Sequence, residues 1–234
     1  TYTVLVDTKD HVAAGDPSGA ILGPESNFTE TDISSYVQQI SIRRGRDDWL
    51  QEYQPGTATV ELTNSDNRFN PDYVSSPYFP NFTVGRAMII LGNYASVSYY
   101  LFFGYIESIV PHPMLSQQTA SISLIDGLAK LSLTKPLSVI EASALSGTLI
   151  TNVLAGTGVT QPGAQIWPTA MRSIDVGQST FFVNYNLVSE LAILQDIARN
   201  ESGFVFAGVN GYIKFRDRLS RITGSASSTS QGTF

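Results

Sequence analysis

Two histidines are the first residues in this sequence to consider for acid–base or metal chemistry. His11 lies in a long polar segment, and His112 stands between Pro111 and Pro113. Neither histidine has a partner at the spacing that a metal site uses, and the sequence contains no cysteine. The lack of cysteine excludes disulfides, thiolate metal sites and cysteine nucleophiles. We therefore interpret both histidines as surface residues.

Acidic side chains offer two further chemical hypotheses. Asp66, Asn70 and Asp72 could surround a calcium ion, but the twelve-residue loop pattern with its terminal glutamate is missing, which favours turn capping. Asp47 and Asp48 could be a pair of glycosidase carboxylates, but adjacent residues on a turn usually diverge. The sequence also lacks the serine-hydrolase, phosphate-loop and zinc-protease motifs. It therefore predicts no catalytic, cofactor or metal site, and no enzyme.

Aromatic residues gather in the loop between Pro71 and Pro80, which contains Tyr73, Tyr78 and Phe79. Together with Phe82 they could form a platform for sugars. They could also plug the end of a barrel, which is the commoner role of buried loop aromatics.

Basic residues alternate along the last predicted strand and beyond it, at Lys214, Arg216, Arg218 and Arg221. They are consistent with the solvated face of a hairpin. They are equally consistent with a docking edge for an acidic neighbour.

The stretch Tyr53–Pro71 organises the first half of the chain. Ala58, Val60 and Leu62 alternate with polar residues, which predicts a strand with one buried face. A Pro-Gly pair precedes this strand, and a type II turn there would require a positive φ at Gly56.

A polar loop follows the same strand. Asn64, Ser65, Asp66 and Asn67 have side chains that favour turns. Phe69 is then the expected apolar anchor of the loop. Pro71 closes the loop, because proline biases the preceding residue away from helix.

Other segments of the first half also have strand patterns. The turn Arg44-Gly45-Arg46 separates two of them, and Gly104 within a long strand suggests a bulge or a close approach of backbones. Strands with turns between them predict an antiparallel barrel or sandwich over residues 1–136. The additional strands are expected near residues 2–6, 37–44, 87–91, 99–109 and 119–125, and a short closing helix near 126–131.

The segment Asp7–Tyr36 is long and polar, with little periodicity. A segment of this composition cannot stabilise itself by burial. We therefore expect this arm to contact a neighbouring subunit or another protein rather than its own barrel, with Ile21, Leu22 and Phe28 as its anchors.

The period changes from two to 3.6 near Lys135-Pro136, which predicts a small α+β domain over residues 137–222. One helix is expected near 145–154, ending at Gly156. A second is expected over Leu187–Ala198, capped by Asn186 or Ser189 and ended by Gly203. An Asn-Gly pair at residues 210–211 predicts a hairpin over 204–215. Residues 223–234 are expected to be a Ser/Thr/Gly-rich tail or linker.

The composition is that of a globular protein, with 42% hydrophobic and 15% charged residues. No apolar run reaches the roughly 18 residues that a membrane helix needs, so no membrane span is expected.

The net charge is −6. Residues 1–136 contain 14 acidic and 8 basic residues, whereas residues 137–234 contain 6 of each. Such acidity argues against tight nucleic-acid binding.

Several short motifs in fixed order resemble a known family. In the first half they are Arg44–Arg46, Tyr53-Gln54, Gly56–Val60 and Asn64–Pro71. They are similar to the first domain of bacteriophage tail-tip proteins, the baseplate-hub or tail-associated minor tail proteins of long-tailed phages. This resemblance implies that residues 1–136 form an antiparallel, tail-tube-like β-barrel.

The second half resembles the same family in its helix-then-hairpin pattern, through Arg172–Asp175, Gly177, Leu191–Ala198, Glu201–Phe204 and Gly211–Arg218. The resemblance thus covers about residues 37–218. From its motifs we select eight structural or interface candidates: Gly45, Gly56, Asp66, Arg68, Phe69, Pro71, Arg216 and Arg218.

The resemblance implies a structural virion protein, made in the bacterial cytoplasm, that forms part of the tail tip or baseplate hub ring. It would join the tail tube to the tip and frame the DNA channel. Its implied partners are copies of itself and other tail proteins (distal tail, tube, tape measure and fibres), and DNA would pass without specific binding.

Two questions of assembly and function stay open. Hub proteins of this kind usually continue into another barrel domain. A trimeric ring is therefore expected if the chain continues beyond Phe234, and a hexamer otherwise. The alternative function is a carbohydrate-binding module for host receptors that uses the Tyr73–Phe82 aromatics.

Overall fold

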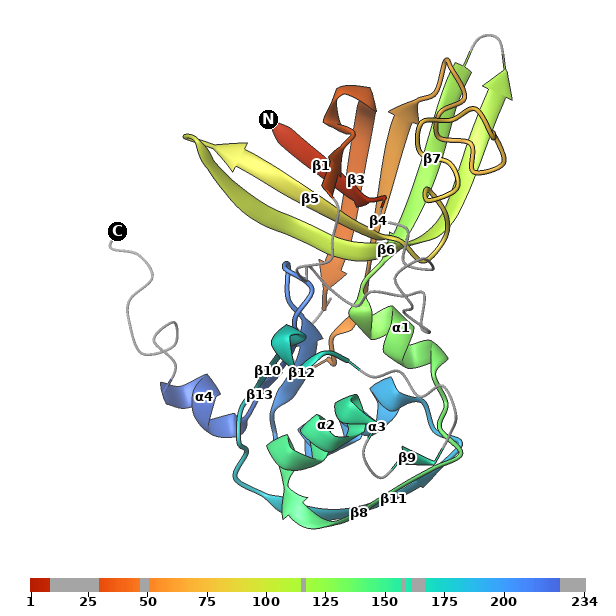
Figure 1. Ribbon diagram of the computed structural model, residues 1–234. Coiled ribbons are helices and arrows are strands. Elements are labelled where there is room, and N and C mark those ends of the chain that lie inside the picture. The colour runs from red at the N-terminus through yellow and green to blue at the C-terminus, as the bar shows by residue number, and fades with distance from the viewer. Residues whose placement is uncertain (9–29, 47–50, 115–116, 157–158, 161–166, 224–234) are drawn as a thin grey trace. The chain divides into compact units, whose positions relative to one another are not determined.

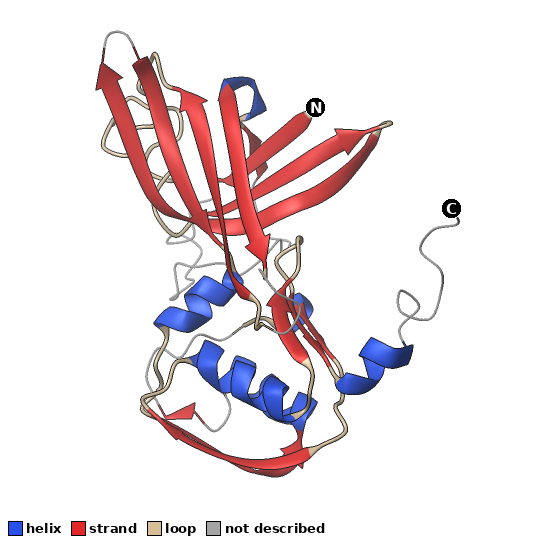
Figure 2. Ribbon diagram, turned by 180° about the vertical axis from the view of Figure 1, so that it is seen from behind, coloured by secondary structure: helices blue, strands red, loops and turns tan. Residues whose placement is uncertain are grey.

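The computed structural model describes residues 1–8, 30–46, 51–114, 117–156, 159–160 and 167–223. These residues form two compact units (Figures 1 and 2). Unit 1 contains the described residues of Thr1–Arg44, Pro55–Gly127 and Gly208–Gly211. Unit 2 contains those of Gly45–Gln54, Leu128–Ala207 and the chain from Tyr212 onward.

Unit 1 is built on a seven-stranded sheet with the order β2-β1-β5-β6-β7-β4-β3. The pairs from β2 through to β4 are antiparallel, which confirms the predicted mainly-β fold with a large antiparallel sheet. The sheet is curved but not closed, because among the described residues no pairing joins β2 to β3 (Figure 2). The predicted barrel is therefore an open sheet. Its strands are β1 (Tyr2–Asp7), β2 (Glu30–Asp32), β3 (Val37–Gly45), β4 (Gln54–Thr63), β5 (Ala87–Tyr94), β6 (Val97–Met114) and β7 (Gln117–Ile125).

The core of unit 1 lies on one face of this sheet. Ala58, Val60 and Leu62 of β4 are buried, as their alternation predicted. They stand opposite Leu124, Ile122 and Ala120 of β7, which are also buried. Period-two burial on two paired strands fixes their register, because a slip by one residue would turn every apolar side chain outward.

The predicted Pro55-Gly56 turn is wrong. Both residues lie inside β4, and Gly56 does not have a positive φ. The ladder between β4 and β7 extends to the pair Thr57–Ile125, so pairing with a distant strand overrides the local turn preference.

The hairpin of β5 and β6 ends in a two-residue turn, in which Ala95 and Ser96 have φ of 48° and 64°. Positive φ at both central residues matches the right-handed twist of the strands. Further along β6, Gly104 is a site of close backbone approach, as predicted. A Cβ there would lie 2.4 Å from Cε1 of Phe102 and 2.6 Å from the carbonyl oxygen of Ile125.

The end of the predicted arm packs on its own sheet. Residues 30–32 form β2, and Ser34–Tyr36 form the 3₁₀ helix η1. Between them Ile33 is fully buried in the core, and its N–H donates to the carbonyl oxygen of Val4 at 2.9 Å. Residues 30–36 therefore pack on their own sheet, contrary to the expectation that the arm would not contact it. A contact of the arm with another subunit stays a prediction. Ile21, Leu22 and Phe28 lie outside the described residues.

Unit 2 combines helices with two three-stranded sheets, of orders β10-β13-β12 and β11-β8-β9. β10 and β13 are parallel and the other pairs are antiparallel. The strands are β8 (Ser138–Leu145), β9 (Val159–Thr160), β10 (Arg172–Ile174), β11 (Thr180–Asn186), β12 (Phe204–Ala207) and β13 (Ile213–Arg216). The helices are α1 (Gly127–Leu133), α2 (Ser146–Ala155), the 3₁₀ helix η2 (Thr169–Met171), α3 (Glu190–Asn200) and α4 (Arg218–Thr223).

Both predicted helices of the second half are present. α2 ends at Gly156, which has the left-handed conformation with φ of 68°. The hydroxyl of Ser189 caps α3 by accepting a hydrogen bond from the N–H of Ala192 at 3.3 Å. Leu187 was predicted to lie on the buried face of α3, and this is wrong. It precedes the helix with a φ of 55°, and its side chain is exposed.

The predicted hairpin is formed by β12 and β13 in antiparallel register. Its connection spans residues 208–212, so Asn210-Gly211 is not a two-residue turn. Only Gly211 of that pair has a positive φ, of 83°.

The boundary between the two units is not a single point in the sequence. Residues 45–54 of the first half belong to unit 2, and residues 208–211 of the second half belong to unit 1. The division into independently folding domains at residue 136 stays a prediction.

Gly104 provides a test of the packing in unit 1. Gly104→Ala is expected to lower the free energy of unfolding by about 1–3 kcal/mol, because the new methyl group overlaps a backbone oxygen. Urea unfolding of the variant measures this loss. Gly92→Ala is the control, since its Cβ would approach only the flexible Leu101 side chain, at 3.1 Å. Equal losses in the two variants would contradict the assignment.

Candidate functional site

The loop after β4 is held by hydrogen bonds to its own backbone. The side-chain oxygen of Asn64 accepts from the N–H of Phe69 at 2.9 Å, and the N–H of Asn67 donates to the carbonyl oxygen of Asn64 at 3.1 Å. Asn67 has a φ of 60°, a conformation that asparagine tolerates better than most residues. Pro71 lies half-buried in the turns that follow. The polar residues therefore form the predicted turn.

Phe69 is the predicted anchor of this loop, and it is fully buried. Its ring centroid lies 5.4 Å from that of Tyr36, 5.6 Å from that of Tyr78 and 5.5 Å from that of Phe82. Two of the aromatic residues considered for a sugar platform are thus part of the core packing. Tyr73 and Phe79 keep 40% and 42% of their surface exposed.

Arg68 and Asp66 form an ion pair on the outside of the same loop, in which two guanidinium nitrogens donate to one carboxylate oxygen. Nε of Arg68 donates to Oδ2 of Asp66 at 2.7 Å, and the guanidinium lies 4.3 Å from the ring centroid of Tyr36. The hydrogen bond from Arg68 holds the pKa of Asp66 below its ordinary value. Asn70 accepts from the N–H of Asp72 at 3.1 Å. These oxygens are used in turn contacts, the role that the sequence favoured over calcium binding.

Glycine is required at position 56 by a close contact with Asp126 rather than by a turn. The N–H of Gly56 donates to Oδ2 of Asp126 at 2.7 Å, and the N–H of Asp126 donates to the carbonyl oxygen of Gly56 at 3.0 Å. A Cβ on Gly56 would lie 2.8 Å from that carboxylate oxygen. The charge of Asp126 also acts on Tyr105. Burial is the larger cause and the negative charge of Asp126 the smaller cause that raise the pKa of Tyr105 far above its ordinary value. Sequence reasoning found Gly56 but missed Asp126, which it assigned only to the start of a helix.

Gly45 ends β3 with a φ of 103°, and no atom lies within 4 Å of a Cβ built there. Its backbone conformation, not lack of space, therefore calls for glycine. In unit 2 the next residue, Arg46, places its guanidinium 5.2 Å from the ring centroid of Tyr53 and 4.5 Å from that of Phe204. The sequence motif contained Arg46, but its aromatic partners could not be predicted.

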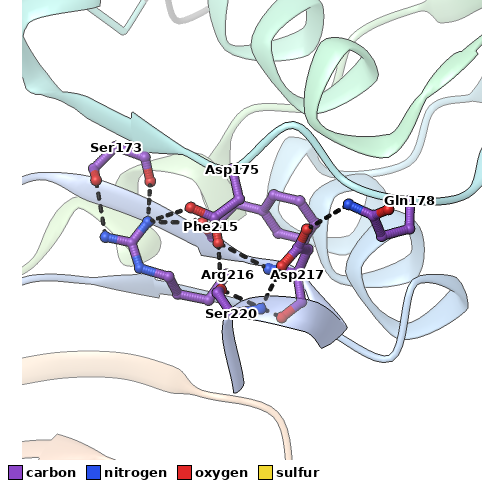
Figure 3. Close-up of polar contacts among 7 residues, drawn as sticks. All are labelled: Ser173, Asp175, Gln178, Phe215, Arg216, Asp217 and Ser220. Carbon is purple, nitrogen blue, oxygen red and sulfur yellow. Dashed lines mark hydrogen bonds and ion pairs between the residues drawn. The ribbon is translucent and has the colours of Figure 1, made fainter. Parts of the chain in front are cut away.

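Arg216 belongs to a polar network that joins β10, β13 and α4 (Figure 3). Its NH1 donates to Oδ1 of Asp175 at 3.0 Å, and its NH2 donates to the hydroxyl of Ser173 at 2.9 Å. The other oxygen of Asp175 accepts from the N–H of Asp217 at 3.1 Å and from the hydroxyl of Ser220. The Arg216 guanidinium is therefore used within unit 2, which supports a structural role.

Asp217 extends this network to the start of α4. Its Oδ1 accepts from the N–H of Ser220 at 2.7 Å, and its Oδ2 accepts from the side chain of Gln178 at 3.3 Å. Burial raises the pKa of Asp217, but the hydrogen bonds that it accepts, above all the one from the N–H of Ser220, lower the pKa by more than burial raises it. The pKa is therefore below its ordinary value.

Arg218 contacts a buried carboxylate in unit 2. Its Nε lies 3.6 Å from Oε1 of Glu201, whose side chain is fully buried. Oε2 of Glu201 accepts from the N–H of Ser179 at 2.7 Å and from the hydroxyl of Ser146 at 3.1 Å. Burial raises the pKa of Glu201, but these hydrogen bonds outweigh it and lower the pKa below its ordinary value. Glu201 lay in a motif but was not selected as a candidate.

Two glycines let the loop after β10 approach the start of α2. A Cβ on Gly147 would lie 1.9 Å from the carbonyl oxygen of Asp175, and a Cβ on Gly177 would lie 1.8 Å from the hydroxyl of Ser146. The hydrogen-bonded backbones therefore require glycine at both positions.

The chemical candidates do not come together as a site. His112 is exposed on β6, where it is paired with Thr119 of β7, and His11, Asp47 and Asp48 lie outside the described residues. Within the described ranges, no three His, Asp or Glu side chains are grouped so that they could hold a metal. Among the described helices, none has the length and apolar character needed to cross a membrane. The candidate residues instead fix loops and strand ends.

Comparison with known proteins gives matches at the level of structure. No family matches the sequence, and no curated protein matches it. A tail protein from Neisseria meningitidis MC58 superposes with a TM-score of 0.53 at 10% identity, over 92% of this chain and 50% of that one. This chain therefore has the fold of a tail protein, and it spans about half the length of the solved chain.

Two further solved structures are similar to the chain. The 43 kDa tail protein of prophage MuSo2 from Shewanella oneidensis matches with a TM-score of 0.48 at 11% identity, over 91% of this chain and 52% of that one. An E. coli component of the type VI secretion system, itself similar to T4 bacteriophage tail proteins, matches with a TM-score of 0.46 at 13% identity. That match covers 78% of this chain and 50% of the other.

Removal of the Phe69 ring tests the anchor of the loop. Phe69→Ala is expected to lower the free energy of unfolding by about 3–5 kcal/mol, because a fully buried ring leaves a cavity among three aromatic neighbours. Chemical denaturation measures the change. Phe79→Ala is the matched control, since that ring is partly exposed, and it should cost much less. An unchanged midpoint for Phe69→Ala would show that the ring is not an anchor.

Glu201 predicts a specific dependence of stability on pH. Because its pKa is lowered in the folded protein, the carboxylate stabilises the fold above its unfolded pKa, and this contribution is lost as pH falls through the folded pKa. Glu201→Gln should cost about 1–3 kcal/mol at pH 7 and weaken the loss of stability in acid.

Urea unfolding at a series of pH values from neutral to acid measures this difference between the wild type and the variant. Near-ultraviolet circular dichroism at pH 7 controls for retention of the fold. Parallel pH profiles for the two proteins would refute the role of Glu201.

Proposed function

We propose that this chain is a structural component of a bacteriophage virion, located in the tail tip or baseplate hub ring. The observation that carries the proposal is the shared fold with a tail protein over 92% of the chain. The motifs of both halves support it, because their residues hold turns, strand ends and packing contacts rather than a reactive centre. In this role the protein joins the tail tube to the tip, frames the DNA channel and catalyses no reaction.

The proposed assembly is a homo-oligomeric ring in contact with other tail proteins, namely the distal tail, tube, tape measure and fibre proteins. The ring has three copies if each copy supplies two domains of this kind, and six copies if each supplies one. The excess of 14 acidic over 8 basic residues in residues 1–136 supports a channel wall that repels DNA. Synthesis takes place in the bacterial cytoplasm, before assembly into the virion.

A carbohydrate-binding module is the second candidate. The partial exposure of Tyr73 and Phe79 favours it, since an exposed ring can stack on a sugar. Tyr78 and Phe82 are committed to the cluster around Phe69, which reduces the proposed platform to two rings. We therefore place this function second.

Electron microscopy of the purified chain and of the virion that contains it tests the proposal. We expect a ring with rotational symmetry at the tail tip and no binding on a glycan array. A peptidoglycan zymogram should be blank. A monomer together with saturable glycan binding would favour the module instead, and Tyr73→Ala with Phe79→Ala would then abolish that binding. A band of clearing in the zymogram would overturn the non-enzymatic assignment.

A further inference from the structure

A groove lies between β1 and β3, where the sheet of unit 1 is open. Its volume is about 580 Å³, and it is lined by Tyr2 and Val4 of β1, by Val37, Ile40 and Ile42 of β3, and by Leu101 of β6. The three apolar residues of β3 and Leu101 are only partly buried, and they pack against the core cluster. Among the described residues no lining side chain is charged, and Thr1, Ser34, Gln38 and Gln39 add polar groups. The groove therefore favours an uncharged, partly apolar occupant.

Both walls of the groove are strand edges. The pairing of β1 with β2 covers only Leu5–Asp7, whereas its pairing with β5 begins at Tyr2. Val4 turns its N–H and carbonyl toward the η1 side, where they bond Ser34 and Ile33. Residues two apart in a strand direct these groups to the same side, so the N–H and carbonyl of Tyr2 face the groove.

The opposite wall, β3, is the last strand in the order and has β4 as its neighbour. Its other edge pairs with no strand in the part of the chain that the structure describes. The edge of β3, with Tyr2 of β1 across an apolar floor, has the features of a site for strand addition, in which backbone hydrogen bonds supply affinity.

A matching free strand edge lies elsewhere in unit 1. β6 pairs with β5 over Val97–Tyr105 and with β7 from Tyr105 onward. Hence the edge of Val97–Gly104 that faces away from β5 pairs with no described strand. The tip of this hairpin continues past the start of β1, as the register Tyr2–Gly92 requires and as Figures 1 and 2 show.

This hairpin tip is unusually apolar for an exposed strand. Tyr94, Val97 and Tyr99 keep 78%, 48% and 53% of their surface exposed. The segment Gly92–Leu101 contains no charged residue. Natural proteins commonly protect free edges with charge or proline, and an exposed apolar edge without either indicates an interaction surface.

We propose that the groove between β1 and β3 receives the free edge of β6, residues Val97–Leu101, from a second copy of this chain. The two surfaces match because both are uncharged and both are unpaired strand edges. Within one copy, the free edge of β6 faces away from β5, whereas β1 lies on the other side of β5, so this edge cannot pair with β1 of its own copy. The donor is therefore a different molecule.

Each copy donates with one surface and accepts with another, so the contact is heterologous. Contacts of this kind close into rings or continue as filaments. The inference rests on the proposed ring function and specifies the surfaces that form it.

Cysteine cross-linking tests the pairing, because the sequence contains no native cysteine. The full 234-residue chain is prepared as Ser98→Cys, as Gln39→Cys and as the control Ser75→Cys; all three positions are exposed. Under mild oxidation, a mixture of the Ser98→Cys and Gln39→Cys proteins is expected to form a disulfide-linked dimer. Either variant alone, or either mixed with Ser75→Cys, should stay uncross-linked.

Sedimentation velocity of the cysteine-free chain distinguishes failure of the proposed strand pairing from failure of the proposed ring. Association of the wild type, loss of the associated species in Tyr99→Lys, and its retention in Tyr73→Lys would support the pairing. Association without cross-linking in the mixture, or with Tyr99→Lys unaffected, would overturn the inference and leave the ring proposal standing. A wild-type chain that stays monomeric at every concentration would overturn both.

Discussion

The pairing of β4 with β7 is the constraint on which the rest of unit 1 depends. The alternating apolar residues of the two strands allow one register, with Val60 opposite Ile122. At one end this register brings Asp126 to Gly56, where two reciprocal hydrogen bonds continue the ladder. At the other end the N–H of Asn64 donates to the carbonyl oxygen of Gln118 at 2.7 Å, which places Asn64 to hold the N–H of Phe69.

Much of this strand pairing could be predicted from the sequence. Period-two alternation identified the buried face of β4, and the polar run after it identified the turn and its anchor, Phe69. The predicted turn at Pro55-Gly56 failed because a distant strand, β7, pairs with this segment, and local propensity carries no information about that partner. The sequence also could not predict that the sheet is open, because closure depends on whether β2 and β3 meet in space.

The candidate residues of unit 2 show the same limit. Sequence motifs located Arg216 and Arg218 but left open whether they form a docking edge. Their carboxylate partners, Asp175 and Glu201, lie 41 residues before Arg216 and 17 before Arg218 in the sequence, and only the fold brings each pair together. Loss of one partner would leave a buried or half-buried charge, which is more costly than the pair is favourable. Arg216 and Arg218 therefore have carboxylate partners within their own unit.

The β4–β7 ladder belongs to the same sheet as the groove between β1 and β3 and the free edge of β6. The surfaces proposed for assembly therefore depend on this ladder. Hydrogen–deuterium exchange of backbone amides tests the central role of this ladder most directly. The amides of β4 and β7 around Val60 and Ile122 are expected to exchange slowest in unit 1, only on global opening. The hairpin tip near Ala95 should exchange far earlier. Exchange of the β4 and β7 amides as fast as those of the tip would contradict the account.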